Sequence, residues 1–474
     1  MDSKSNIQIK NKFKTPEGRY TLLFEKLYGT VQFDYQRSTK ITIARIDASS
    51  EDPGPWLIYN IGDLVNICKQ DTSKKDPLRS LIMPATRQPC VITCHAFMQS
   101  KDGNDLLIGM SDGSVSILSL RSQLKLPVGS NKPKITETLL PLEVERENAC
   151  CVAVLWMPRS GGATFLVAFA SGYIYTYKKS SVVGEPSSKF SLGLGSSKKD
   201  HTPLATFNLN TGITDAVLSP DGTRLAVTCR DGSLRLLDPS TGSVLGGMQS
   251  YYGAFTCCCF SQDGKYVAVG GEDDMVVVYG LKEKCPIAHC EGHRSWVSSV
   301  SFDPWAHGGA AAGLYRIASV GQDAQMCLWD VQSSSGMEGG GNDMMQGSPR
   351  PGMRKAASQA SLQALGWQGA DVSTGATNVI STGAGIPASN LAPSNPPANK
   401  PSTAHTASQT GVGTLSKPSS LIYPSVPHSE MVVYEPLMEH RLHVEPLSDV
   451  LVTESTIFTA DHAGCLRAWL RPGK

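Results

Sequence analysis

The chain repeats one pattern of short strands and tight turns along most of its length, and this repetition constrains the fold more than any other feature. Each copy reads as an alternating strand, a turn, a second apolar strand, an acidic tight turn and a third strand. The clearest copies occupy residues 213–238, 255–279 and 297–330. Asp231 and Asp273 occupy corresponding turns in two of them, and their spacing matches one four-stranded propeller blade of roughly 40–45 residues.

Four weaker copies flank these three and bring the number of repeats to seven. They are found at residues 56–68, 106–120, 150–178 and 456–470. Asp-Gly pairs, as at Asp263-Gly264, favour tight reversals between strands. No apolar stripe with the 3.6-residue helical period accompanies the copies, which excludes a helical solenoid. The pattern therefore predicts an all-β fold, a single seven-bladed β-propeller.

One long segment does not follow the repeat and separates the sixth copy from the seventh. Residues 332–429 are rich in Ser, Ala, Gly, Pro and Asn and poor in charged and aromatic residues. Such a composition cannot bury enough apolar surface to offset the entropy of ordering, so we predict a disordered insertion before the last blade. The predicted organisation is an N-terminal segment that helps to close the ring (1–50), blades one to six (51–331), the insertion (332–429), and the last blade with closure (430–474).

Charge and cysteine usage limit the classes of partner and the compartment. Lys and Arg number 43 and Asp and Glu number 42, for a net charge of +1, so we expect neither a nucleic-acid partner nor a membrane partner. The N-terminus has no secretory signal, and no stretch reaches the roughly 18 apolar residues of a membrane helix. The 13 cysteines lack the spacing of zinc ligands. We therefore expect reduced thiols, no metal, and an intracellular protein of the cytoplasm, the nucleus or both.

The sharpest motif lies in the sixth copy, where Gly292-His293 is followed by Ser319, Asp323 and Trp329-Asp330. In WD-repeat proteins these positions build a buried hydrogen-bond chain, from His293 to Asp323 and from Ser319 to Trp329. A buried His and Asp are tolerated when they are paired in this way. The alternative, a Ser-His-Asp catalytic triad, would need a nucleophile elbow and an oxyanion loop, and the sequence has neither. We interpret the four residues as structural, and expect no catalytic residue and no cofactor.

Three blocks of sequence together resemble one family of WD-repeat proteins. They are residues 9–23, residues 250–330 and the terminal 469–474. The chain resembles the WD-repeat cofactors of ubiquitin-specific proteases, a family that includes CreC-like and dystrophia myotonica WD-repeat-like proteins. Two features depart from the family's pattern: Ala254 stands where a second glycine is usual, and the 305–315 insertion is short and rich in small residues.

This resemblance implies a non-catalytic scaffold that binds a ubiquitin-specific protease and raises its activity, often together with a second WD-repeat protein. One alternative is a substrate receptor or adaptor for a cullin-type ubiquitin ligase. However, Asp330 is followed by Val331-Gln332, and no copy shows the Trp-Asp-x-Arg sequence expected of such a receptor. The other alternative is a general protein-interaction scaffold, whereas an enzyme in its own right lacks a supporting constellation of residues.

A partner site is predicted where aromatic residues precede the first core strand of neighbouring blades. Aligning the fifth and sixth copies on their turns pairs Tyr252 with Arg294 and Ala254 with Trp296. Connections of this kind line one face of the disc and commonly carry binding residues. Because Tyr, Trp and Arg dominate binding hot spots, we predict contact at Tyr252 and Trp296, with Arg294 and Tyr251 beside them. The alternative is that Trp296 merely packs over the top of its blade.

The insertion also contains one candidate modification site. Ser358 follows Arg354-Lys355 at the spacing that suits a basophilic kinase. The alternative is ordinary linker composition.

Overall fold

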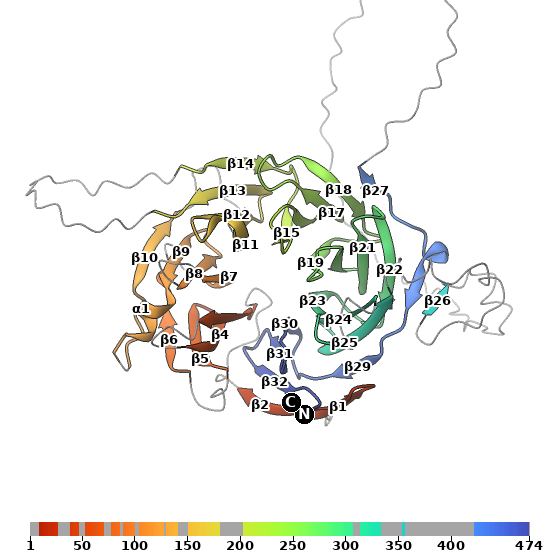
Figure 1. Ribbon diagram of the computed structural model, residues 1–474, viewed down its shortest axis with the longest axis horizontal. Coiled ribbons are helices and arrows are strands. Elements are labelled where there is room, and N and C mark those ends of the chain that lie inside the picture. Colours follow the sequence, from red (N-terminus) through yellow and green to blue (C-terminus); the bar gives the residue numbers. More distant parts are fainter. Residues whose placement is uncertain are drawn as a thin grey trace, which may run out of the picture. The chain divides into compact units, whose positions relative to one another are not determined.

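The computed structural model describes residues 9–26, 38–46, 53–70, 77–85, 89–99, 104–127, 129–140, 150–180, 202–306, 313–332, 353–355 and 421–473. Their strands form seven sheets arranged around a ring (Figure 1). This arrangement confirms the predicted all-β, seven-bladed propeller. The α-helix in this part of the chain, α1 (Leu120–Leu124), is short, and no helix among the described residues is long and apolar enough to cross a membrane.

Blades 1 to 3 are four-stranded antiparallel sheets whose strands follow one another from the inside of the ring to its rim. Blade 1 contains β3 (Ile41–Ile46), β4 (Gly54–Ile61), β5 (Leu64–Lys69) and β6 (Arg79–Ile82); blade 2 contains β7 (Ile92–Gln99), β8 (Asn104–Met110), β9 (Val115–Ser119) and β10 (Ile135–Leu139); blade 3 contains β11 (Cys151–Trp156), β12 (Thr164–Phe169), β13 (Tyr173–Lys178) and β14 (Ala205–Asn208). Blade 1 thus begins within the predicted N-terminal segment 1–50, because β3 supplies the innermost strand that each blade needs.

The three clearest repeats form blades 4 to 6. Blade 4 contains β15 (Ile213–Leu218), β16 (Leu225–Cys229), β17 (Ser233–Leu237) and β18 (Val244–Gln249); blade 5 contains β19 (Phe255–Phe260), β20 (Tyr266–Gly271), β21 (Met275–Gly280) and β22 (Cys285–Glu291); blade 6 contains β23 (Val297–Asp303), β24 (Leu314–Gly321), β25 (Gln325–Gln332) and β29 (Met438–Arg441). Gly222 and Gly264 both have a φ of 68° in the predicted Asp-Gly turns, a left-handed conformation that glycine adopts without strain.

Strands from both ends of the described chain close the ring in blade 7. This blade contains β30 (Leu447–Val452), β31 (Thr456–Asp461), β32 (Leu466–Leu470), β2 (Gly18–Lys26) and β1 (Lys12–Thr15). β2 pairs with β32, and β1 pairs with β2. Arg467 of β32 also forms an ion pair with Glu25 of β2 at 2.6 Å. N-terminal strand material therefore covers the edge of β32, as a closed ring requires.

The chain does not pass directly from β25 to the outer strand of blade 6. It returns at Leu421 and follows the rims of blades 4 and 5 first (Figure 1). β27 (Ile422–Tyr423) pairs parallel with β18, and β28 (Val432–Tyr434) pairs parallel with β22 and antiparallel with β26 (Met353–Lys355). Only then does β29 complete blade 6. We call residues 421–437 the returning segment.

The returning segment shifts two of the predicted boundaries. The end of the predicted disordered insertion, residues 421–429, carries β27 and a short 3-10 turn (His428–Glu430). The predicted last blade, 430–474, in fact begins at Leu447, because β28 and β29 belong to the rims of blades 5 and 6. Few apolar residues anchor this stretch, and it follows a long polar segment. The sequence composition therefore did not reveal its strands.

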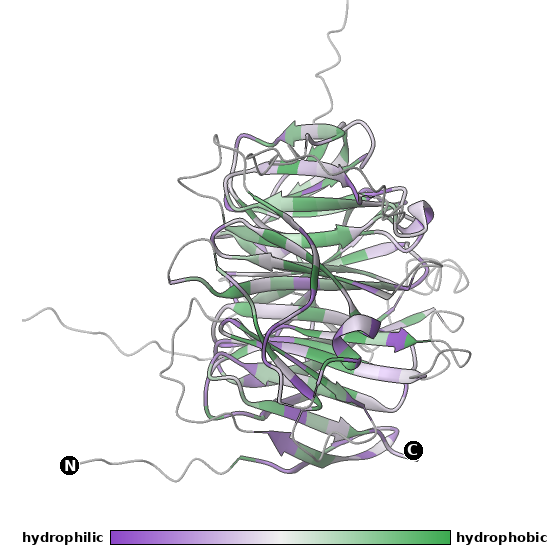
Figure 2. Cartoon of the chain, turned by 90° about the vertical axis from the view of Figure 1, so that its left-hand side faces the viewer, coloured by the Kyte–Doolittle hydropathy of each residue, from purple (hydrophilic) through white to green (hydrophobic). Residues whose placement is uncertain are grey.

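The core lies between the blades, where the apolar faces of neighbouring sheets pack together. Figure 2 shows hydrophobic residues concentrated on the strands and hydrophilic residues mainly in the connections. All 13 cysteines are free thiols, and several, such as Cys257 and Cys327, pack within an inter-blade cluster. Burial raises the pKa of Cys229 to about 11 and that of Cys257 to about 12. These two thiols therefore stay protonated at neutral pH and are poor nucleophiles.

Candidate functional site

The four predicted partner-binding residues lie in two loops that connect consecutive blades. Tyr251 and Tyr252 belong to the connection from β18 to β19 (250–254), and Arg294 and Trp296 to the connection from β22 to β23 (292–296). We call these connections the first and second aromatic loops. Tyr252 is 72% exposed, Tyr251 53% and Trp296 45%, and the Arg294 side chain is 78% exposed. All four side chains are therefore open to solvent.

Matching backbone hydrogen bonds show that the two loops occupy equivalent positions on blades 5 and 6. The Glu272 amide donates to the Ala254 carbonyl, and the Gln322 amide donates to the Trp296 carbonyl, both at 2.9 Å. The pairing of Ala254 with Trp296 in the sequence alignment thus holds in space. Ala254 is buried, whereas Trp296 places a half-exposed indole at the same position on the next blade. The two loops therefore lie on the same face of the disc.

Polar contacts fix the backbone of the first aromatic loop. The Ser250 hydroxyl donates to the Gly253 carbonyl at 2.6 Å, and the Ala254 amide donates to Glu272 Oε2 at 2.9 Å. Gly253 has a φ of 67°, and a Cβ at this position would lie 2.9 Å from the Glu272 side chain. Glycine is therefore needed here, and the tyrosines are presented by a fixed backbone rather than by a free loop.

Two residues of the chain's C-terminal part border the aromatic loops, and sequence reasoning did not find them. His428 Nε2 lies 2.5 Å from Glu291 Oε1, and the His428 ring lies 6.4 Å from that of Tyr251. Glu439 of β29 pairs with Arg294 at 3.2 Å. His428 falls inside the segment predicted to be disordered, so no sequence signal pointed to it. The predicted phosphosite, Ser358, lies outside the described residues.

The motif of the sixth copy forms most of the predicted hydrogen-bond chain. His293 Nδ1 donates to Asp323 Oδ2 at 3.0 Å, and His293 Nε2 lies 2.6 Å from Ser319 Oγ. The predicted last link is wrong: the buried Trp329 Nε1 has no hydrogen-bond partner among the described residues. Ser319 bonds to the histidine, and the Trp329 ring packs against His293 with centroids 5.8 Å apart. These groups are buried between blades, where no substrate can reach them, so the geometry is that of a structural motif.

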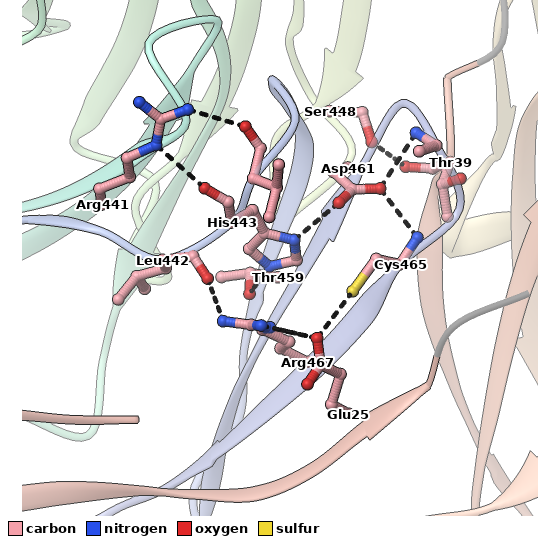
Figure 3. A network of polar contacts seen from close by, with 12 residues as sticks. Glu25, Thr39, Arg441, Leu442, His443, Ser448, Thr459, Asp461, Cys465 and Arg467 are labelled. Atoms are coloured by element: carbon pink, nitrogen blue, oxygen red, sulfur yellow. Dashed lines mark hydrogen bonds and ion pairs between the residues drawn. The ribbon is translucent and has the colours of Figure 1, made fainter. Parts of the chain in front are cut away.

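Blade 7 contains a complete chain of the same kind, which the sequence analysis missed; Figure 3 shows its His443, Thr459 and Asp461. Trp469 Nε1 donates to Thr459 Oγ1 at 3.1 Å, which lies 2.8 Å from His443 Nε2. His443 Nδ1 in turn donates to Asp461 Oδ2 at 3.0 Å. Thr459 and Trp469 have the same spacing as Ser319 and Trp329, but Asp461 comes two positions earlier than the acid of the sixth copy. That offset disguises the motif in the sequence.

The corresponding acid of blade 5 has no such partner. Asp273 occupies the position of Asp323, but the place of the histidine is taken by Tyr251, which points to solvent. Its Oδ2 is buried with no hydrogen-bond partner among the described residues. Burial raises the pKa of Asp273 to about 6, and the backbones of Met275 and Tyr252 offset part of that rise. In blade 6, burial acts in the same direction on Asp323, but hydrogen bonds from His293 and neighbouring amides outweigh it and lower the pKa.

One buried group has ligand atoms close enough together for a metal ion. His443, Asp461 and Cys465 place one such atom each within 4.8 Å of the others. Hydrogen bonds already use them: Asp461 Oδ1 accepts from the Ala463 and Cys465 amides, and Asp461 Oδ2 accepts from His443. Burial also raises the pKa of Cys465 to about 12, so its thiolate is costly to form. The group is satisfied as a structural network.

Comparison with known proteins fits this geometry. The model of the family described as "WD domain, G-beta repeat" matches residues 201–238, 245–280 and 284–330, which cover blades 4 to 6. Blades 4 to 6 of this chain therefore carry WD repeats. The WD-repeat propeller is generally a non-catalytic scaffold, and the matched residues include both aromatic loops.

A curated relative refines the resemblance. The chain is 30% identical over 265 residues to the "UBP9-binding protein bun62" of Schizosaccharomyces pombe, a match over 51% of this chain and 46% of that protein. The match therefore spans about half the length of this relative, and it supports the resemblance to WD-repeat proteins that bind ubiquitin-specific proteases. A chain from the "Crystal Structure of Mitotic Checkpoint Complex" superposes with a TM-score of 0.55 at 10% identity, over 99% of this chain and 95% of that one. This last likeness concerns the fold alone.

Proposed function

We propose that this WD-repeat protein is a non-catalytic scaffold that binds a ubiquitin-specific protease and raises its activity, with the aromatic loops as the contact surface. The observation that carries the proposal is the pair of fixed, neighbouring loops that present exposed Tyr252 and Trp296 on one face of a rigid ring. The class of partner is supported by the relative named for binding UBP9. A second WD-repeat protein completes the proposed assembly, which we place in the cytoplasm, the nucleus or both.

The energy of such a contact would be concentrated in few side chains. Exposed aromatic residues and arginine are the types whose truncation most often costs about 2 kcal/mol or more at an interface. That cost corresponds to a roughly 30-fold larger dissociation constant, and so to weaker binding. Since Tyr252 is exposed and Trp296 half-exposed, truncating these side chains should weaken binding of the partner and leave the ring folded.

Activation would be an effect on the protease, since the propeller would supply no reacting group. A bound protein changes an enzyme's activity only through its higher affinity for the active conformation. The ring would therefore stabilise a conformation that the protease already visits. Typical coupling free energies of about 1–3 kcal/mol correspond to roughly 5–150-fold changes in equilibrium.

The experiment starts with affinity purification of the full chain and identification of what is retained. The recovered ubiquitin-specific protease is then titrated with the wild-type chain and with Tyr252→Ala, Trp296→Ala and the double variant. Leu78→Ala serves as the control, because Leu78 is an exposed apolar residue of blade 1, remote from the loops. Undiminished binding by a well-folded double variant would contradict the proposed surface. Recovery of a cullin adaptor in place of a protease would favour the ligase alternative.

A further inference from the structure

The path of the returning segment is longer than the fold requires. In blades 4 and 5 the outer strand follows its neighbour through a short connection, as from β21 to β22. The outer strand of blade 6, β29, comes more than 100 residues after β25, and the chain first visits the rims of blades 4 and 5. A four-stranded blade can be completed without this detour. Its contacts therefore need another explanation.

Those contacts lie directly beside the first aromatic loop. Ile422 and Tyr423 pair with Gly247 and Met248 at the end of the strand that leads into the loop. Ile422 Cδ1 also lies over Gly247, 2.9 Å from where a Cβ would stand, although the Leu234 carbonyl oxygen at 2.0 Å already requires glycine at this position. Met431 joins the apolar cluster that contains Met248, and Val426 packs against the same cluster. The returning segment is thus anchored on the residues that support the loop.

The same segment also reaches the exposed face. The His428 side chain is 45% exposed and the Glu291 side chain, its partner at 2.5 Å, is 39% exposed. His428 lies against Tyr251, with ring centroids 6.4 Å apart. Past the segment's end, Glu439 pairs with Arg294 of the second aromatic loop. The returning segment and β29, which follows it, therefore border both aromatic loops at the surface.

We infer that the partner surface is composite: the returning segment positions the first aromatic loop through His428 and extends the surface on which the protease docks. This inference rests on the proposed function and names a second element of the same site. The apolar residues of the segment fix it on the rim. His428 is thereby held in place and contacts Tyr251 and Glu291. Affinity for the protease then depends on residues far in sequence from the repeats that carry the aromatic loops.

The test compares variants within one short turn of the full-length chain. His428→Ala should weaken binding of the recovered protease about fivefold, with the midpoint of thermal unfolding unchanged, because both partners of His428 are exposed. His428→Gln should restore most of the affinity, since its amide can still donate to Glu291. Glu430→Ala is the matched control, because Glu430 lies in the same turn and is exposed.

A second comparison replaces longer stretches of the chain. Replacing residues 357–420 with a short Gly-Ser linker should leave affinity unchanged. Replacing His428, Ser429 and Glu430 with three glycines in that background should weaken it. Wild-type affinity in both His428→Ala and the glycine variant, with Tyr252→Ala still defective, would overturn the composite surface and leave the proposed function standing. Undiminished binding by Tyr252→Ala and Trp296→Ala would instead overturn the aromatic loops as the contact surface of the proposed function.

Discussion

Replacing Asp273, the acid of blade 5 whose pKa is raised by burial, should make the ring more stable at neutral pH. Asp273 is a carboxylate under the first aromatic loop, where blade 6 has a His-Asp pair and blade 5 has the exposed Tyr251 in place of the histidine. Asp273→Asn removes the charge and keeps an acceptor for the Met275 amide, which now donates to Oδ1 at 3.3 Å. The substitution therefore removes the free-energy cost of a buried charge and loses few contacts.

The magnitude follows from the raised pKa. The rise in the pKa of Asp273 from its ordinary 3.8 to about 6, at about 1.36 kcal/mol per pH unit, sets an upper limit of about 3 kcal/mol. The side chain is partly exposed, and screening by water leaves about 1–2 kcal/mol. Because the folded state holds this proton more tightly than the unfolded state, the group's contribution to stability is present below about pH 4. It is lost as the pH rises through about 6.

The assay is thermal unfolding of wild type and Asp273→Asn between pH 4 and 8. The variant should unfold about 2 °C higher at pH 7.5, and the difference should vanish towards pH 4. Asp323→Asn is the matched control: its acid is stabilised in the charged form by His293, so its loss should lower the unfolding midpoint at pH 7.5. An Asp273→Asn variant that is equally or less stable than wild type at pH 7.5 would show that the buried carboxylate does not destabilise the fold.

Two further predictions concern the buried tryptophans of blades 6 and 7 and the returning segment. Trp469→Phe should cost about 1 kcal/mol more of unfolding free energy than Trp329→Phe, because only Trp469 donates a hydrogen bond; equal losses in chemical denaturation would contradict this. Replacing residues 357–420 with a short linker should leave the thermal midpoint within about 1 °C, whereas extending the replacement to residue 434 should lower it, because Met431, Val433 and Tyr434 are buried. Equal midpoints for the two deletions would show that the returning segment adds no stability.

Much of the ring could be predicted because its determinants are local in sequence. Asp-Gly turns such as Asp263-Gly264 define the strands on either side of them, and one repeated length predicts a blade. The aromatic loops could be aligned for the same reason, since Trp296 and Ala254 stand at the same distance from their turns. Equivalent backbone hydrogen bonds in the structure confirm that alignment.

The parts that escaped prediction depend on contacts between residues distant in sequence. His428 gains its position from Glu291 and Tyr251, both more than 130 residues earlier, and no local pattern encodes that pairing. The hydrogen-bond chain of blade 7 escaped for a different reason, because Asp461 reaches His443 from a shifted position in the turn. Trp329 shows the converse: its place in the motif predicts a hydrogen bond that the geometry does not supply.

The most direct test of the central claim is the rate at which the recovered ubiquitin-specific protease cleaves a fluorogenic ubiquitin substrate. We expect the wild-type propeller at saturating concentration to raise kcat/KM. The Tyr252→Ala, Trp296→Ala double variant should do so only at much higher concentration, and the propeller alone should cleave nothing. Equal activation by the wild type and the double variant at the same subsaturating concentration would contradict activation through the aromatic loops.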